Sequence, residues 1–220
     1  MCEDQLCRKQ FIIREVRKYL KLKSKEKPRL IDLRCGFGWL THELSKYGAI
    51  VGVDLSADAA RTLYPNLKFI ETNIIEDKIE EKYNIVVSSE VIEHLAQKDQ
   101  LIYISKVYDL LTKGGILIMT TPNKPVVERL LIKNYITRGD LQPIENWLNK
   151  ESLRTLLSPY FEISFMGTTM FRPDFTRNNR YIDLAYYFIH IRIVKSYKLV
   201  NNIIGSSIKG LYMTIVASKR

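Results

Sequence analysis

Residues 29–54 read as a strand, a glycine turn, a helix and a second strand. The apolar run at 30–33 is typical of a buried parallel strand, and Gly36 and Gly38 follow it one residue apart. Two glycines at such a turn permit positive φ and let a ligand approach the backbone closely. The second strand ends at Asp54, where a carboxylate can bind the ribose hydroxyls of a nucleotide. This stretch therefore predicts an α/β domain that binds a nucleotide-like cofactor.

The spacing around the glycines separates two cofactor classes. Nicotinamide and flavin sites use G-x-G-x-x-G, and Thr41 stands where the third glycine would be needed. The second class begins with an acid and has the pattern D-x-G-x-G-x-G, whose four positions are occupied here by Asp32, Arg34, Gly36 and Gly38. This pattern resembles motif I of the class I S-adenosylmethionine (SAM)-dependent methyltransferases, with an arginine in place of the first glycine. The alternative is an ordinary strand-to-helix turn of an α/β domain.

Three further segments extend the resemblance in the same order along the chain. YNIVVSSEVIEHL at 83–95 resembles the fourth-strand segment of the type 11 methyltransferases, which include the ubiquinone-biosynthesis O-methyltransferases. Segments 111–123 and 147–167 are similar to later strands and a helix of that family. With a last strand at 211–218, the resemblance implies a Rossmann-like class I methyltransferase fold. In that α/β fold a mostly parallel seven-stranded sheet has an antiparallel last strand, and helices cover both faces.

The resemblance implies SAM as the cofactor and places its binding site at the carboxyl ends of the strands. The residues expected to bind it are Asp32, Arg34, Cys35, Gly36, Gly38, Asp54, Leu55, Asn73, Ile74 and Ser89. Asp54 is expected at the ribose, and Asn73 near the adenine, although a turn asparagine is the alternative for that position. Cys35 is expected to pack within the turn. We hypothesise that Arg34 pairs with the cofactor's carboxylate, for which its planar guanidinium is suited.

Two residues after the fourth strand are candidates for catalysis. The resemblance places Glu90 and His94 near the reacting methyl group. An imidazole titrates near neutral pH, so His94 is a candidate general base, with a helix cap as the alternative. Methyl transfer from an activated sulfonium mainly needs proximity and alignment. The three cysteines and three histidines show no metal-ligand spacing, so no metal is expected.

The net charge of +10 is concentrated at the two ends of the chain. Ten lysines and arginines accompany four acids in residues 1–29, and nine accompany two in residues 172–220. This predicts an anionic partner, although solvated lysine-rich faces would give the same pattern. We expect a small-molecule methyl acceptor that is lipophilic or anionic, such as a quinone, lipid or glycan precursor. An RNA methyltransferase and a non-catalytic SAM-fold binding protein remain open as alternatives.

The length fits one SAM-dependent methyltransferase domain with additions on its substrate side. Its expected parts are an N-terminal helix in 1–28, a cofactor-binding core at 29–123, and substrate-side insertions at 124–149 and 171–209. Within the second insertion, residues 178–204 carry an apolar stripe of helical period.

The stripe at 178–204 is flanked by arginines and lysines, which exclude a membrane-spanning helix. It predicts a helix that either packs on the domain or contacts a membrane surface. Residues 1–23 are charged throughout and do not resemble a signal peptide. A cytoplasmic, reducing location is therefore expected, with peripheral membrane contact as an alternative.

Overall fold

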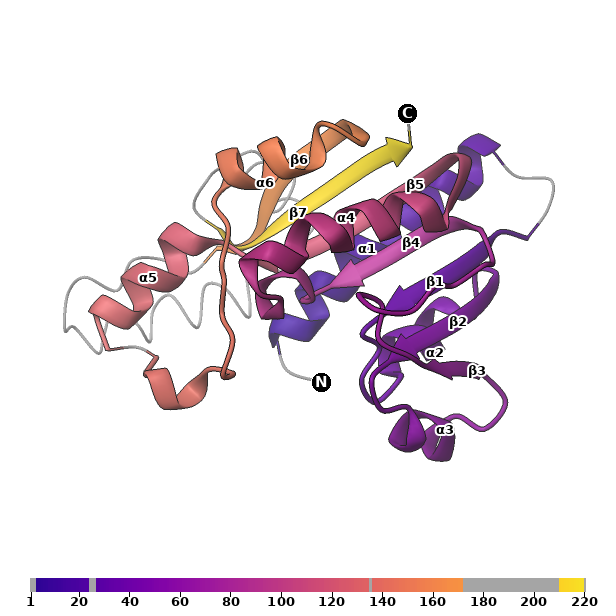
Figure 1. Cartoon of the computed structure of the whole chain (residues 1–220), viewed down its shortest axis with the longest axis horizontal. Helices are drawn as coiled ribbons and strands as arrows, with labels where there is room; N and C mark the ends of the chain where they lie inside the picture. The colour runs from indigo at the N-terminus through magenta and orange to yellow at the C-terminus, as the bar shows by residue number, and fades with distance from the viewer. Residues whose placement is uncertain (1–2, 24–26, 135, 172–209, 220) are drawn as a thin grey trace, which may run out of the picture.

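The computed structural model describes residues 3–23, 27–134, 136–171 and 210–219 (Figure 1). Its strands are β1 (Arg29–Leu33), β2 (Ala49–Asp54), β3 (Lys68–Glu71), β4 (Tyr83–Ser89), β5 (Leu111–Pro122), β6 (Phe161–Phe171) and β7 (Gly210–Lys219). Its α-helices are α1 (Glu3–Lys23), α2 (Trp39–Leu44), α3 (Asp58–Leu63), α4 (Gln97–Leu110), α5 (Lys124–Ile132) and α6 (Lys150–Leu157). Two 3-10 helices, η1 (Ile92–His94) and η2 (Arg138–Asp140), complete the described elements. The helix predicted at 178–204 lies outside the described residues.

All seven strands form one sheet in the order β3-β2-β1-β4-β5-β7-β6. The pairs β1–β2, β1–β4, β2–β3 and β4–β5 are parallel. Strand β7 runs antiparallel to both β5 and β6 and fills the space between them. The predicted mixed sheet with an antiparallel last strand is therefore confirmed. The strand order reverses between β1 and β4, and open α/β sheets bind ligands at such a point.

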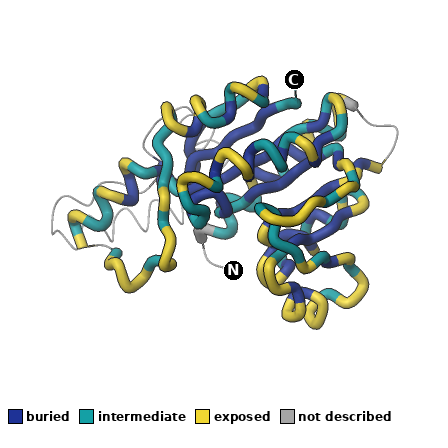
Figure 2. The backbone as a smooth tube through the Cα atoms, viewed as in Figure 1, coloured by how far each residue is buried: buried dark blue, intermediate teal, exposed yellow. Residues whose placement is uncertain are grey.

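The central strands bury side chains on both faces, because successive residues of a strand point to opposite sides. In β4, Val86 packs into a cluster that also contains Tyr103 and Ile104 of α4 and Leu153 of α6. Its neighbour Val87 packs into a second cluster. That second cluster is formed with residues of α1 and α2, including Ile12, Val16, Leu40 and Leu44. Helices therefore cover both faces, and the strands between them are the most buried part of the chain (Figure 2).

Two local predictions from the sequence were wrong, namely that Ser56 caps a short helix near 57–64 and that Gly114 and Gly115 close the helix that precedes the fifth strand. Ser56 does not cap the third helix, since α3 begins at Asp58 and its N-cap position is Ala57, which makes no side-chain capping bond. The glycine pair at 114–115 does not end a helix either, since α4 ends at Leu110 and the glycines lie inside β5. Gly114 has φ 72°, and a Cβ on Gly115 would lie 2.9 Å from the Asn84 carbonyl oxygen. Close strand packing therefore accounts for this pair.

Helix α1 lies against the sheet and combines a buried face with a basic outer face. Phe11, Ile12 and Val16 are buried, whereas Lys18 and Lys21 are largely solvent-facing. Its apolar side is therefore occupied by the domain itself. Among the described residues, every helix is too short or too polar to cross a bilayer.

Candidate active site

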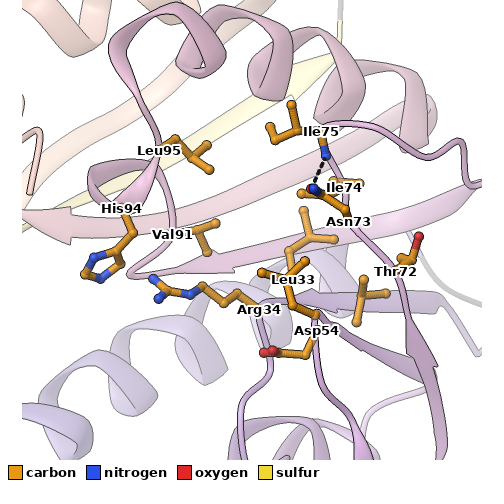
Figure 3. A pocket seen from close by; sticks show the side chains of 12 residues that line it. Leu33, Arg34, Asp54, Thr72, Asn73, Ile74, Ile75, Val91, His94 and Leu95 are labelled. Carbon is orange, nitrogen blue, oxygen red and sulfur yellow. Dashed lines mark hydrogen bonds between the residues drawn. The ribbon is translucent and has the colours of Figure 1, made fainter. Parts of the chain in front are cut away.

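A pocket opens where four parallel strands end, at the reversal of strand order between β1 and β4 (Figure 3). Its walls come from the segments that follow β1, β2, β3 and β4. The lining residues are Leu33, Arg34, Val53, Asp54, Leu55, Thr72, Asn73, Ile74, Ile75, Val91, His94 and Leu95. Most are apolar, and a few polar groups converge between them, which is typical of a site for a small molecule or cofactor.

Six of the predicted site residues meet in this pocket. They are Arg34, Asp54, Leu55, Asn73, Ile74 and His94. The other six predicted residues lie outside the lining. They are Asp32, Cys35, Gly36, Gly38, Ser89 and Glu90. The pocket is therefore lined by residues at the strand ends. The remaining motif I residues are Asp32, which lies in β1, and Gly36 and Gly38, which lie in the turn that follows β1.

Gly36 and Gly38 are each required in the turn for a different structural reason. Gly36 has φ 52°, and a Cβ built on it would have no atom within 4 Å, so the space above it is open. Gly38 has φ 76°, and a Cβ there would lie 2.8 Å from the Phe69 ring. Gly38 is thus required by packing beneath the turn, whereas Gly36 leaves room for a ligand to approach the backbone.

The carboxyl group of Asp32 supports the turn from inside the fold. It is 1% exposed and accepts a 2.7 Å hydrogen bond from the Thr41 hydroxyl. Burial is the main cause that raises the pKa of Asp32 to about 7; the Thr41 bond opposes this shift, and the charge of Asp54 contributes to it. Cys35 is also buried, and burial raises its pKa to about 12, which keeps the thiol neutral. A packing role, as expected for Cys35, agrees with this environment.

Asp54 presents its carboxylate at the pocket and also fastens the glycine turn. Its Oδ2 accepts a hydrogen bond from the Gly36 N–H at 2.8 Å, and its Oδ1 accepts from the Ser56 N–H at 3.3 Å. Ionised carboxylate oxygens have further lone pairs, so the group can still accept bonds from a ligand's hydroxyls.

Asn73 forms the turn that follows β3. Its Oδ1 accepts a 3.0 Å hydrogen bond from the Ile75 N–H, as Figure 3 shows. Asn73 therefore has the role of a turn asparagine, which was the alternative to a contact with adenine. The amide oxygen has a second lone pair, so its proposed contact with adenine stays a prediction.

Arg34 has the left-handed conformation that its position in the turn requires, with φ 58°. Its side chain extends along the pocket toward His94 (Figure 3). The guanidinium donates to Gln142 Oε1 at 2.8 Å and to the Glu90 carbonyl oxygen at 3.4 Å. An arginine is thus accommodated at the first glycine position without closing the pocket, because its side chain forms part of one wall.

Glu90 and Ser89 are directed toward β5 and α1. The Glu90 carboxylate accepts a 3.1 Å bond from the Thr120 hydroxyl and lies 3.7 Å from the Arg8 guanidinium. The Ser89 hydroxyl lies 3.0 Å from the Thr120 hydroxyl. These contacts favour a supporting role for both residues, and the catalytic role of Glu90 stays a prediction.

His94 is the titratable residue of η1 that faces the pocket. Its Nδ1 lies 3.2 Å from the Ile144 carbonyl oxygen, and its Nε2 lies 3.7 Å from Glu93 Oε1. Burial lowers the pKa of His94, as does the positive charge of Arg34, so the imidazole is neutral near pH 7. A neutral ring has a free lone pair, and His94 can therefore act as a base.

Glu93 is a buried acid beside this histidine. It is 1% exposed, and its Oε2 accepts a 2.9 Å bond from the Thr121 hydroxyl. Its Oε1 has no hydrogen-bond partner among the described residues. Burial raises the pKa of Glu93 well above its ordinary value, and the nearby charges of Glu90 and Glu145 raise it too. Burial and the neighbouring charges therefore favour the protonated form of this carboxyl group.

Several residues at this site carried no sequence signal. Ile144 and Glu145 lie about fifty residues from His94, and Gln142 lies 108 residues from Arg34, in a segment without regular periodicity. Only the general expectation that residues 124–149 cover the substrate side pointed to them. Among the described residues, no group of three or more histidine, cysteine or acidic side chains is arranged to hold a metal ion.

The strand order, the glycine turn and the acid at the tip of β2 define a protein of the class I SAM-dependent methyltransferase fold. A methyltransferase domain family model matches residues 7–160, and the chain belongs to this family. The class indicated by motif I is thereby confirmed.

The chain is also similar to curated proteins. One is the mitochondrial ubiquinone biosynthesis O-methyltransferase of Mus musculus, with 28% identity over 151 residues, which are 60% of this chain and 40% of that protein. The chain spans about half the length of the curated relatives it matches.

Solved structures share the fold at low sequence identity. A protein from Pyrococcus horikoshii has a TM-score of 0.67 at 17% identity, with 100% of this chain and 92% of that chain covered. The N-methyltransferase NodS from Bradyrhizobium japonicum, solved with S-adenosylhomocysteine, has a TM-score of 0.58 at 13% identity. In that pair 95% of this chain and 87% of NodS are covered. These likenesses confirm the Rossmann-like methyltransferase fold.

Proposed function

We propose that this protein methylates an oxygen atom of a small-molecule acceptor with SAM as the methyl donor. The observation that carries the proposal is one pocket that is lined by both Asp54 and His94. The Asp54 carboxylate is suited to bind the hydroxyls of a ribose. The His94 imidazole is suited to accept the proton that an acceptor hydroxyl must lose. The names of the curated relatives favour a precursor of ubiquinone, which fits the expectation of a lipophilic acceptor.

The residues present fit this cofactor. Asp54 would hold the ribose hydroxyls, and Asn73 with Ile74 would lie at the adenine. The open space above Gly36 would admit the methionine part, whose carboxylate would pair with Arg34. When bound, SAM supplies a methyl group on a positively charged sulfur, which leaves as a neutral thioether once the acceptor oxygen has taken the methyl group.

The chain's own contribution is to orient the acceptor and to accept its proton. Nε2 of His94 takes the proton from the acceptor hydroxyl as the new carbon–oxygen bond forms, and later releases it to solvent. The apolar side chains of Val91 and Leu95 beside His94 exclude water from this end of the pocket. Proximity and alignment supply most of the rate enhancement, since the methyl group is already activated.

Titration calorimetry with SAM and with S-adenosylhomocysteine tests the cofactor assignment. We expect saturable binding that Asp54→Asn weakens by about 10- to 100-fold, the size of a lost hydrogen bond to a charged group. Asp58→Asn is the matched control, because this carboxylate is exposed on α3 and lies outside the pocket lining; it should bind like the wild type. A folded sample that binds neither compound would overturn the proposal and favour a non-catalytic protein.

Transfer of a labelled methyl group tests the acceptor. We expect label in small molecules of a lipid extract, and His94→Gln should reduce this transfer while SAM binding persists. Label that enters only total RNA would contradict the small-molecule proposal and support the RNA alternative, as would a steep salt dependence of RNA affinity.

We further propose a cytoplasmic protein whose basic segment 178–204 contacts membrane surfaces, which would bring a lipophilic acceptor within reach. The apolar stripe and the flanking arginines and lysines of that segment support this location. Binding to anionic vesicles and loss of binding on removal of the flanking charges would test it.

A further inference from the structure

Residues 141–147, here called the strap, lie across η1 at the end of the pocket that holds His94. Two hydrogen bonds, one from the backbone and one from the side chain of Asn146, fix the strap to η1 and to the residue that follows it. The Asn146 N–H donates to the Glu93 carbonyl oxygen at 2.7 Å, and Asn146 Nδ2 donates to the Leu95 carbonyl oxygen at 2.8 Å. The strap is therefore held in register with His94 independently of any contact that the imidazole makes.

The strap presents only acceptors to Nδ1 of His94. The Ile144 carbonyl oxygen lies 3.2 Å from this nitrogen, and Glu145 Oε1 lies 3.6 Å from it. A carbonyl or carboxylate oxygen cannot donate a hydrogen bond, so Nδ1 must carry the proton for either contact to be favourable. In a neutral ring, Nε2 then has the lone pair.

The Glu145 carboxylate is itself fixed by its neighbours in the strap. The Trp147 indole N–H donates to Oε2 at 2.6 Å, and the Gln142 backbone N–H donates to Oε1 at 3.3 Å. Its side chain is 14% exposed, close to the 13% of His94, so the pair is largely shielded from water. A carboxylate held in this way can stabilise a neighbouring imidazolium without reorganisation when the ring gains a proton.

We propose that Glu145 is a positioning residue which, with the Ile144 carbonyl, keeps the proton of His94 on Nδ1 and leaves Nε2 free to take the acceptor's proton. This inference rests on the proposed base role of His94 and identifies the element that prepares it. The proton moves from the acceptor hydroxyl to Nε2, and the resulting imidazolium has its Nδ1 proton facing Glu145. In this arrangement His94 is the base and Glu145 is the carboxylate that orients it.

Three charged or titratable groups face His94, and their effects differ. Glu93 lies on its own element, Glu145 on the strap, and Arg34 on the turn after β1. Burial and Arg34 lower the pKa of His94, whereas the Ile144 bond and the charge of Glu145 raise it. Removal of the Glu145 charge should therefore lower the pKa of His94 and weaken the preference for a proton on Nδ1.

Nuclear magnetic resonance of protein labelled with ¹⁵N in its histidines tests the proposal without a ligand. The chain has three histidines, at 42, 94 and 190, and His94→Gln identifies the signals of His94. We expect the Nδ1–H tautomer in the wild type at neutral pH. In Glu145→Gln the tautomer ratio should move by about tenfold toward Nε2–H, as loss of one charge-assisted contact predicts, and the pKa should fall.

Glu128→Gln is the matched control, because it removes the same charge from an exposed glutamate on α5. It should leave the His94 signals unchanged. An Nε2–H tautomer in the wild type, or identical His94 signals in Glu145→Gln and the wild type, would overturn the proposal. Unchanged His42 signals in Glu145→Gln show that the variant is folded. Since this measurement needs no cofactor, a failure of SAM binding by calorimetry is distinguished from a failure of the positioning role.

Discussion

At the residue scale, Arg34 combines a strained backbone conformation with a side chain that forms hydrogen bonds across the pocket wall. A left-handed conformation costs an ordinary residue roughly 1–2 kcal/mol relative to its right-handed conformation, and glycine avoids this cost. Arg34 adopts φ 58° and therefore bears this cost. In this conformation its guanidinium bridges the glycine turn to Gln142. Strain of this kind persists at sites where the side chain is needed for function.

Two substitutions separate the backbone of Arg34 from its side chain. Arg34→Ala removes the guanidinium but keeps Cβ, and Arg34→Gly removes both. We expect the glycine variant to be more stable than the alanine variant by about 1 kcal/mol, because only glycine relieves the strain. Urea denaturation measures the difference, and equal midpoints would show that the backbone is unstrained.

The same pair of variants tests the contact with the cofactor's carboxylate. Both should bind SAM more weakly than the wild type if the guanidinium pairs with that group. Tighter binding by Arg34→Gly would show instead that the arginine obstructs the pocket.

Asp32 should make stability depend on pH. Its pKa is about 7 in the folded protein and near its ordinary value of 3.8 in the unfolded chain. Between these values the folded state holds a proton that the unfolded state has released, so stability falls as pH rises from about 4 to 7. The full effect is at most roughly 4 kcal/mol.

Asp32→Asn tests this source of the pH dependence. The variant should show a smaller decline in urea midpoint between pH 4 and pH 7, because asparagine does not titrate; the buried acid Glu93, whose pKa is also raised, accounts for the decline that remains. Thr41→Val should extend the decline to higher pH, since the Thr41 bond lowers the pKa of Asp32 in the folded protein while the pKa in the unfolded chain is unchanged. A decline that persists unchanged in Asp32→Asn would place the titrating group elsewhere.

At the element scale, the strap depends on Asn146 for its attachment. The side chain donates to the Leu95 carbonyl oxygen, and the Asn146 carbonyl oxygen accepts a 3.1 Å bond from Gln100 Nε2. We expect Asn146→Ala to accelerate amide hydrogen exchange of residues 141–147, because one of the bonds that close the strap is lost. The global unfolding free energy should change by only about 1 kcal/mol.

Ser158→Ala is the control for the strap experiment. It also removes one side-chain bond to a carbonyl oxygen, that of Arg154 at the end of α6. Exchange in the strap should stay at the wild-type rate in this variant. If both variants exchange alike, the Asn146 side chain does not hold the strap.

The core strands and the pocket at their tips were predictable because each depends on short-range patterns. The run at 30–33 forms most of β1, and Asp54 ends the neighbouring strand β2. These two strands are parallel, so their ends lie together. Boundaries failed where packing overrode local preference. The glycines at 114–115 suggested a helix end but lie in β5, where the Asn84 carbonyl excludes a side chain.

The strap was beyond sequence reasoning for a different physical reason. Its residues act through contacts across about fifty positions, such as Glu145 with His94. Such a pairing depends on the path that the chain takes through α5 and η2. The local hydrophobic periodicity of the sequence does not indicate this path. The segment at 178–204 lies outside the described residues, so its helix stays a prediction.

At the scale of the whole molecule, α1 completes the core by covering one face of the sheet. Ile12 is 0% exposed and packs among residues of β1, β4 and β5. We expect Ile12→Ala to lower the free energy of unfolding by about 2–5 kcal/mol, as a large-to-small substitution in a core does. Both faces of the sheet should unfold in one transition.

Leu22→Ala on the same helix is the matched control. Leu22 is 83% exposed, so its truncation should change the unfolding free energy by no more than about 0.5 kcal/mol. Equal losses of stability in the two variants would mean that α1 does not pack as described. Thermal or urea unfolding, followed by circular dichroism, measures both.

The position of β7 also sets an order of events during protein synthesis. In the sheet, β6 is joined to β5 only through β7, which the ribosome makes after both. Asn123, at the entrance to α5, donates hydrogen bonds to the carbonyl oxygens of Gly210 and Leu211. A nascent chain can therefore assemble β1 to β5 early, but β6 cannot join the sheet until β7 has been made. Any factor that binds the emerging chain during this delay would meet the exposed edge of β5 before β7 covers it.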